Sequence, residues 1–219
     1  MYGTGISHLI SDGQYDVAVL LSGGIDSAVL LEYMRSERLK PIAVHFAGLS
    51  SPAESAAAHA VAEHMQVRCW SIDMSSLLLS FRSTRITEEG PGERAVFGAA
   101  TMYSAASAFA IAHRIDSVAI GLHREDAEIY IEQSPAFLDH IRQGLKLVGS
   151  RVQVLVPFQD LSKSDVVQKG CALGVEMSLT WSCLRPSGSV QCGTCVACSA
   201  RRTAFKQAAV VDATRYENA

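Results

Sequence analysis

The sequence has no excess of basic residues, no internal repeat and no low-complexity segment. Its 19 Lys and Arg are outnumbered by 22 Asp and Glu, and the net charge of -3 makes a nucleic-acid partner unexpected. The N-terminal segment MYGTGISHLISDG lacks a basic stretch followed by an apolar one, so we expect no secretory signal and a cytoplasmic protein. A length of 219 residues with 48% hydrophobic content is enough for one α/β domain.

Long runs of large apolar residues are also missing. The longest candidate, 95–113 (AVFGAATMYSAASAFAIAH), consists mainly of small residues and carries Thr101, Tyr103, Ser104 and Ser107. Leu and Ile are almost absent from it, so its hydrophobic driving force for membrane insertion is weak. We expect a helix buried against the sheet of an α/β protein, and no membrane partner.

Metal-binding residues are concentrated in one segment. The 7 histidines are scattered without metal-ligand spacing, whereas Cys183, Cys192, Cys195 and Cys198 form a C-x8-C-x2-C-x2-C pattern. Each C-x2-C step lets two thiolates converge on one ion, and four thiolates complete the closed shell of a structural zinc site. Disulfides are the alternative, but four cysteines this close together favour one metal in a reducing compartment.

A glycine-rich turn, SGGIDS, is the second motif. The apolar run 15–21 before it predicts a buried parallel strand, and the segment Ser27–Glu37 predicts a helix. Glycines allow close approach of the backbone, hydroxyls donate hydrogen bonds, and the helix start adds partial positive charge. The turn therefore predicts a phosphate or pyrophosphate site made by Ser22, Gly23, Gly24, Asp26 and Ser27. Asp26 would repel phosphate unless it organises the loop or recruits Mg²⁺.

Strands and helices are expected to alternate along the chain. The predicted strands are Asp16–Leu21, Pro41–Phe46, Val67–Ile72, Ser117–Gly121 and Val152–Pro157. The predicted helices are Ser27–Glu37, Ala53–Met65, Arg94–His113, Ala136–Leu147, Lys163–Leu173 and Ser199–Ala209. This order predicts an α/β fold with a parallel five-stranded, Rossmann-like sheet and helices on both faces. We expect an α/β domain over residues 1–178 and a zinc-binding lobe with a closing helix over 179–219, in one compact unit.

Ligands of such sheets bind beyond the carboxyl ends of the strands. We therefore expect one rim to collect the loop Ser22–Ser27, His45, Asp73, the segment His123–Asp126 and the end of the fifth strand. His45 and His123 themselves are expected to be structural.

Three other features have ordinary explanations. Cys69 and Cys171 are expected to be packed thiols in apolar surroundings. The pair Arg201–Arg202 is expected on a solvated helix face, from which it could approach a triphosphate. Lys163 follows an N-cap-like Ser162, where a lysine is usually just exposed. Because the helix dipole disfavours a cation there, an anionic ligand is the alternative explanation.

Together, SGGIDS and the four cysteines resemble the 7-cyano-7-deazaguanine synthase (QueC) family of PP-loop ATP pyrophosphatases. Weaker matches in the same order are Pro91-Gly92, Gly121, Asp126, Tyr130, Pro157 and Lys163. The resemblance implies a PP-loop (HUP) fold, structural Zn²⁺, ATP as co-substrate and Mg²⁺. Homodimers are common in that family.

The resemblance also implies an activity. These synthases adenylate the carboxylate of 7-carboxy-7-deazaguanine, release pyrophosphate, form an amide with ammonia, and dehydrate it to a nitrile after a second adenylation. It assigns catalytic roles to Asp26 and Lys163 and pyrophosphate contact to the SGGIDS loop and Lys163. It places the substrate near Asp126, Tyr130, Glu132 and Arg94.

The acceptor side departs from the family pattern. A run of the type Asp-Tyr-Gly-Gln is replaced by Phe46-Ala-Gly-Leu-Ser-Ser51, and Pro-Gly-Arg-Asn by Pro91-Gly-Glu-Arg94. The segment Tyr-Pro-Asp-Cys-Arg becomes Tyr130-Ile-Glu-Gln-Ser134, so an arginine able to pair with a carboxylate or phosphate is lost. The ATP-binding half is retained and the acceptor half is altered.

Three interpretations remain open. The chain is a QueC-like ligase whose nucleophile is ammonia or another amine, such as a protein amine in a paralogue encoded in a phage-defence operon. It is another PP-loop enzyme, acting in tRNA thiolation or amidation, although no basic stripe or RNA-binding domain is visible. Or it is a non-catalytic nucleotide-binding subunit, against which the intact SGGIDS loop argues.

Overall fold

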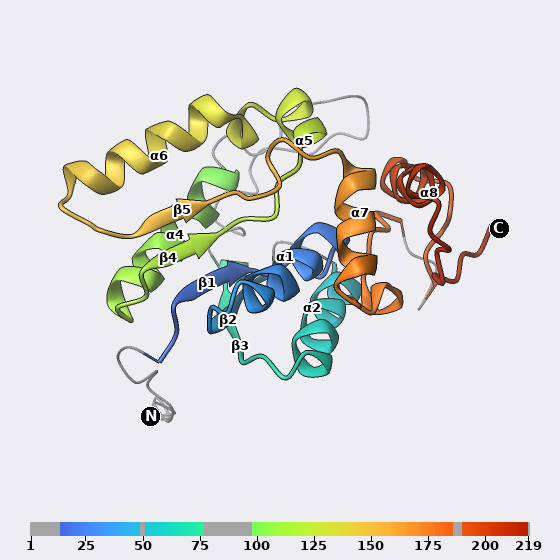
Figure 1. Cartoon of the computed structure of the whole chain (residues 1–219), viewed down its shortest axis with the longest axis horizontal. Coiled ribbons are helices and arrows are strands. Elements are labelled where there is room, and N and C mark those ends of the chain that lie inside the picture. The colour runs from blue at the N-terminus through green and yellow to red at the C-terminus, as the bar shows by residue number, and fades with distance from the viewer. Residues whose placement is uncertain (1–13, 49–50, 77–97, 186–189, 219) are drawn as a thin grey trace.

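The computed structural model describes residues 14–48, 51–76, 98–185 and 190–218. Its centre is a five-stranded parallel sheet in the order β3-β2-β1-β4-β5 (Figure 1). The strands are β1 (Val17–Leu20), β2 (Pro41–Ala47), β3 (Cys69–Asp73), β4 (Ser117–Ala119) and β5 (Gln153–Leu155). The α/β fold and its five strands were predicted from the alternating sequence pattern, and the structure confirms them.

Helices cover both faces of the sheet. One face carries α1 (Ile25–Ser36), α2 (Pro52–His64) and α7 (Lys163–Ala172), and α8 (Val196–Ala208) packs against α7. The other face carries α4 (Gly98–Ala112) and α6 (Pro135–Leu147). Successive residues of β1 show the alternation, because Val17 and Val19 join the first cluster while Ala18 joins the second. The sheet is therefore the buried middle layer.

Helix α4 fits close to the sheet because of its small residues. Ala106 and Ala110 are completely buried against the sheet cluster, as the small-residue pattern predicted. The expected start at Arg94 lies outside the described residues. No helix in the described part of the chain is both long and apolar enough to cross a membrane.

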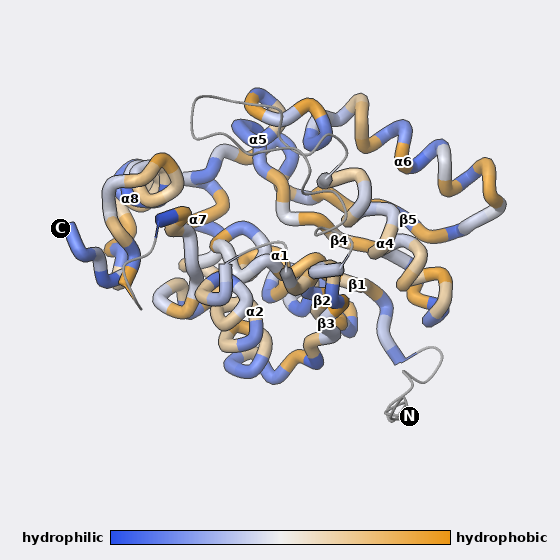
Figure 2. The backbone as a smooth tube through the Cα atoms, turned by 180° about the vertical axis from the view of Figure 1, so that it is seen from behind, coloured by the Kyte–Doolittle hydropathy of each residue, from blue (hydrophilic) through white to orange (hydrophobic). Residues whose placement is uncertain are grey.

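Helix α6 is amphipathic, and Figure 2 shows polar and apolar residues alternating along it. Leu138 and Leu145 on its inner side are buried, whereas Leu147 at its end is exposed. Pro135 follows the N-cap Ser134, whose hydroxyl accepts a hydrogen bond from the Phe137 amide at 3.3 Å.

The sequence did not predict three short elements or the start of the last helix. The short elements are α5 (Arg124–Ile129) and the 3₁₀ turns η1 (Ile131–Gln133) and η2 (Met177–Leu179). Helix α8 begins at Val196, before the predicted Ser199, because the Cys195 side chain caps it by accepting from the Cys198 amide. The α8 residues Ala204, Phe205 and Ala208 belong to the same hydrophobic cluster as residues of α7. The C-terminal segment therefore shares a core with the sheet domain.

Candidate active site

The site lies at the point where the sheet order reverses. Strands β1 and β4 are neighbours, while β2 and β5 continue the sheet in opposite directions, so the connections after β1 and β4 flank a crevice. Gly121 after β4 packs on the first turn of α1, where an added Cβ would lie 3.0 Å from the Asp26 carbonyl carbon and oxygen. The absence of a side chain at Gly121 therefore lets the two connections approach each other.

The SGGIDS loop connects β1 to α1, and hydrogen bonds within the loop stabilise its conformation. Ser27 Oγ donates to the Gly24 carbonyl at 3.0 Å and accepts from the Ser22 amide at 3.2 Å. Gly24 N donates to Ser22 Oγ at 3.2 Å. Gly23 has φ +96°, and a Cβ there would collide with the Glu54 carbonyl oxygen of α2. Ser27 thus braces the loop from inside, whereas Ser22 is exposed at the cavity.

The two residues assigned catalytic roles are in contact. Lys163 is the first residue of α7, and its Nζ lies 2.7 Å from Asp26 Oδ2 in the first turn of α1. The side chains of Lys163 and Asp26 are 23% and 18% exposed, so the pair is partly shielded and open on one side. The second oxygen of Asp26, Oδ1, is buried and has no hydrogen-bond partner among the described residues. The ion pair offsets the charge of Asp26, and its free oxygen is available to a cation.

Asp126 lies beside this pair at the start of α5. Burial raises the pKa of its carboxyl, hydrogen bonding to His123 N lowers it, and the charge of nearby Asp26 raises it again, with a net shift upward. Asp126 Oδ2 accepts from His123 N at 3.0 Å as part of a capping box. Asp126 therefore both satisfies the backbone amide at the start of α5 and forms part of the cavity wall.

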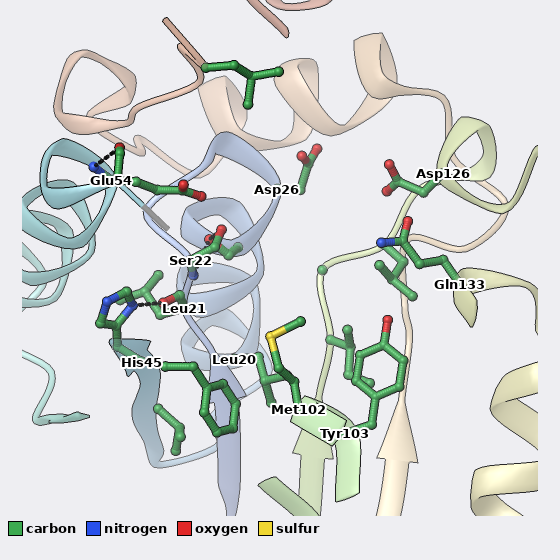
Figure 3. Close-up of a pocket in the computed structure, with 18 of the residues that line it drawn as sticks. Leu20, Leu21, Ser22, Asp26, His45, Glu54, Met102, Tyr103, Asp126 and Gln133 are labelled. Atoms are coloured by element: carbon green, nitrogen blue, oxygen red, sulfur yellow. Dashed lines mark hydrogen bonds between the residues drawn. The ribbon is translucent and has the colours of Figure 1, made fainter. Parts of the chain in front are cut away.

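A cavity of about 560 Å³ connects these groups (Figure 3). Apolar side chains line its base, and the polar Ser22, Asp26, Glu54 and Asp126 surround them. A nucleotide-sized ligand fits such a volume. Burial raises the pKa of the Glu54 carboxyl to about 7, and no hydrogen bond to this carboxyl is present among the described residues.

Of the predicted substrate-binding residues, only some lie at the cavity. Asp126 lines the cavity, whereas Tyr130 and Glu132 do not. Glu132 Oε2 instead accepts from the Ala99 amide at 3.0 Å, near the start of α4. Tyr130 is the C-cap of α5, and Arg94 lies outside the described residues. Ser134, which replaces the expected arginine, is the N-cap of α6.

Sequence reasoning missed several polar residues that line the cavity, among them Glu54, Tyr103 and Gln133. Gln133 follows Glu132 in the segment already singled out, and its Oε1 is buried without a partner among the described residues. Position after a predicted strand could have pointed to Glu54, because it lies in the first turn of the helix that follows β2. Nothing in the sequence distinguishes the side of α4 on which Tyr103 lies.

The expected rim forms only in part. His45 is buried, and its Nδ1 lies 2.9 Å from the Leu21 carbonyl while Nε2 lies 3.0 Å from Ser55 Oγ, so it braces the cavity wall. Asp73 is exposed and accepts from the Ser75 amide at 2.8 Å. Asp73 does not line the cavity.

The four C-terminal cysteines converge as predicted. Their sulfur atoms all lie within 4.8 Å of one another, all four residues are buried, and none is in a disulfide. Backbone amides donate to three of the sulfurs, including Cys192 N to Cys183 Sγ at 3.2 Å. Amide hydrogen bonds stabilise thiolates. This closed set of four sulfur ligands fits a structural metal ion.

The segment before the cysteine cluster touches the SGGIDS loop. Trp181 N donates to the Gly23 carbonyl at 2.9 Å, and Cys183 and Leu184 line the cavity. The cysteine cluster therefore lies beside the cavity.

Two expectations about individual side chains are wrong. Arg201 is fully buried, where it donates to Thr180 Oγ1 at 2.7 Å and pairs with Asp212 at 3.1 Å, so only Arg202 is solvent-exposed. Cys171 is exposed rather than packed, because it lies on the outer side of α7. Cys69 is partly buried, and burial raises its thiol pKa to about 11.

Comparison with known proteins decides the family. The family model described as "Queuosine biosynthesis protein QueC" matches residues 16–209. The chain belongs to the QueC family. Among its QueC-family relatives, the 7-cyano-7-deazaguanine synthase of Methanoculleus marisnigri is 32% identical over 90% of this chain and 97% of the relative. That of Allorhizobium ampelinum is 31% identical over 92% of both chains.

A solved structure supports the fold independently. The NMN synthetase from Francisella tularensis has a TM-score of 0.55 and 19% identity, and the match covers 92% of this chain and 80% of the other. At that identity the likeness concerns the fold alone. The α/β fold of this QueC-family chain is therefore shared with that synthetase.

Proposed function

We propose that this QueC-family protein adenylates the carboxylate of 7-carboxy-7-deazaguanine or a close analogue and transfers the acyl group to ammonia. The observation that carries the proposal is the ion pair of Lys163 with Asp26 at 2.7 Å, because Asp26 belongs to the SGGIDS loop and lines the cavity formed where the sheet order reverses. The relatives are named as 7-cyano-7-deazaguanine synthases, which supports a 7-deazaguanine as the class of compound.

The first step is attack of a carboxylate oxygen on the α-phosphorus of ATP. The bond between the α-phosphorus and the bridging oxygen breaks, and pyrophosphate leaves with that oxygen. The SGGIDS backbone and Ser22 would hold the leaving pyrophosphate, and Lys163 would offset negative charge as it develops. In the second step the amine attacks the acyl carbon, the bond to AMP breaks, and a proton leaves the nitrogen. Positioning is the main requirement of that step.

Two metals fit the residues present. The buried Asp26 Oδ1, which has no partner within the described ranges, is a suitable oxygen ligand for Mg²⁺ accompanying ATP. Mg²⁺ would supply charge neutralisation on the polyphosphate. Four buried sulfurs within 4.8 Å suit Zn²⁺ in a purely structural role, because no position of a four-thiolate shell remains open.

The nucleophile is a separate question, and one observation bears on it. The missing arginine is replaced by Ser134, whose hydroxyl is used within the chain as an α6 cap and donates to the Ile131 carbonyl at 2.7 Å. The acceptor side has thus lost a charged group of the family pattern. We propose ammonia as the nucleophile and, as the second candidate, another amine such as a protein amine in a QueC-like defence-system paralogue.

Exchange of labelled pyrophosphate into ATP tests the adenylation step without assuming a nucleophile. Exchange that requires 7-carboxy-7-deazaguanine is expected from the wild-type protein. Lys163→Met should reduce it by about a hundredfold or more, since loss of one stabilising charge-assisted contact costs about 3 kcal/mol in the transition state. The exposed Lys146 on α6 provides the matched control, and Lys146→Met should leave exchange unchanged. Exchange independent of the deazapurine, or insensitive to Lys163→Met, would contradict the assignment.

A further inference from the structure

His123 contacts the Lys163 side chain of the Lys163–Asp26 pair and has no role in the reaction as outlined above. It follows β4 as the N-cap of α5, and its side chain is 6% exposed. Its Nε2 lies 3.3 Å from Lys163 Nζ, and its Nδ1 lies 2.9 Å from Glu125 Oε2. The imidazole is therefore held between an ammonium and a carboxylate.

The chemistry of these neighbours fixes the position of the ring proton. An ammonium group only donates hydrogen bonds, so Nε2 must accept from Lys163. A carboxylate only accepts, so Nδ1 must carry the proton and donate it to Glu125. These two contacts favour the tautomer that carries its proton on Nδ1. A proton on Nε2 would remove the acceptor that faces Lys163. The protonated Nε2 could then donate to Asp126 Oδ1, which lies 3.4 Å away.

Glu125 also holds the start of α7. The same Oε2 that accepts from the ring lies 3.2 Å from the backbone amide of Lys163 and accepts from it. One carboxylate thus fixes both the tautomer of His123 and the main chain of Lys163. The ammonium has three protons, of which one is directed to Asp26 and one to His123. The third proton is left for a bound ligand, beside the cavity that Asp26 and Asp126 line.

We propose that His123, held as the Nδ1-protonated tautomer by Glu125, is a positioning residue that fixes the ammonium of Lys163 for contact with the polyphosphate. The proposal rests on the proposed adenylation. It differs from a packing role because it requires an acceptor at the place of Nε2 and acts only through Lys163.

Substitutions at His123 separate the two roles. Glutamine can place its amide oxygen near the position of Nε2, whereas leucine fills the space without an acceptor. His123→Leu should lower kcat for AMP formation by about ten- to a hundredfold, the range found when an orienting partner is removed. The KM for ATP should change much less, and His123→Gln should recover most of the rate. In a Lys163→Met background, His123→Leu should cause no further loss, because residues that act through one another are not additive.

A matched pair of glutamates extends the test. Glu125→Leu should lower kcat in the same direction, whereas Glu128→Leu on the exposed side of the same helix should not. Equal rates for His123→Leu and wild type would overturn the proposal. So would losses that simply add to that of Lys163→Met, or a His123→Gln variant as slow as His123→Leu.

One measurement tests the proposal even if the substrate is wrongly assigned. Long-range ¹H–¹⁵N correlation spectra of the whole protein distinguish the two imidazole tautomers, and His123→Gln assigns the signal. The Nδ1-protonated form is expected. Finding the Nε2-protonated form overturns the positioning role, whereas the expected tautomer in a protein that makes no AMP would support the arrangement and count against the proposed activity instead.

Discussion

Replacing the buried Arg201 by methionine should destabilise the protein and loosen the wall of the cavity to which we assign ATP. Arg201 is completely buried in α8, and its guanidinium donates to the Met177 carbonyl at 3.0 Å, to Thr180 Oγ1 at 2.7 Å and to Asp212. These contacts hold the segment that leads to Trp181, whose amide donates to the Gly23 carbonyl. One arginine thus connects the C-terminal helix with the segment that contacts the SGGIDS loop.

The size of the effect follows from what the substitution leaves behind. Methionine retains most of the buried volume but removes every donor, so Asp212 keeps a charge in a site where its side chain is only 10% exposed. Burial raises the pKa of Asp212, but hydrogen bonds from Arg201 and Tyr216 outweigh it and lower the pKa overall. Breaking a buried ion pair from one side costs about 3–5 kcal/mol. We therefore expect Arg201→Met to lower the free energy of unfolding by about 3 kcal/mol.

Urea unfolding followed by circular dichroism would measure this loss. The adjacent Arg202 is exposed, and Arg202→Met should change the free energy of unfolding by less than about 0.5 kcal/mol. Arg201→Met should also weaken binding of a non-hydrolysable ATP analogue under conditions in which the protein is still folded. A loss below about 1 kcal/mol, or the same loss in both variants, would refute the role given to the Arg201 contacts.

Three further predictions concern the loop, the cavity and the metal. Gly121→Ala should weaken ATP binding by about tenfold or more in calorimetry, because its Cβ would lie 3.0 Å from the Asp26 backbone, whereas Gly144→Ala, with nothing within 4 Å, should not. Burial raises the pKa of the Glu54 carboxyl from 4.5 to about 7, so the folded protein binds a proton on this carboxyl more tightly than the unfolded chain does. The stabilisation that comes from this protonation is therefore lost as the pH rises from 4.5 to about 7. Relative to wild type, Glu54→Gln should thus gain about 1–3 kcal/mol between pH 4.5 and 8 in unfolding experiments. Elemental analysis should find one zinc ion per chain, lost with Cys198→Ala.

Each of these has an outcome that would contradict it. Equal ATP affinity in both glycine variants would mean that α1 tolerates the added methyl group. A stability difference between Glu54→Gln and wild type that does not change with pH would show that this carboxyl titrates normally. Iron in place of zinc, or no metal in protein purified under reducing conditions, would count against the structural zinc site.

The sequence predicted the elements whose patterns are local. The apolar strand before SGGIDS, the helix after it and the C-x2-C steps are each specified by neighbouring residues, and all appear in the structure. The small residues of 95–113 correctly indicated a helix against the sheet, because Ala106 and Ala110 leave room for close packing.

Features that depend on distant residues were not predictable in this way. Arg201 was expected in solvent because a charged residue is rarely buried, and only the positions of Met177, Thr180 and Asp212 explain its burial. Glu132 was assigned to the substrate, yet the Ala99 amide lies within hydrogen-bond distance. Contacts of this kind depend on the orientation of each side chain within the folded protein.

The central claim is that ATP activates the carboxylate of a deazapurine, and an isotope label tests it most directly. The protein would be incubated with ATP, Mg²⁺, ammonium and 7-carboxy-7-deazaguanine labelled with ¹⁸O in its carboxylate, and the products identified by mass spectrometry. Transfer of an ¹⁸O atom into AMP, with an amide or nitrile as the other product, is the predicted result. No AMP, or AMP without the label, would contradict activation of that carboxylate.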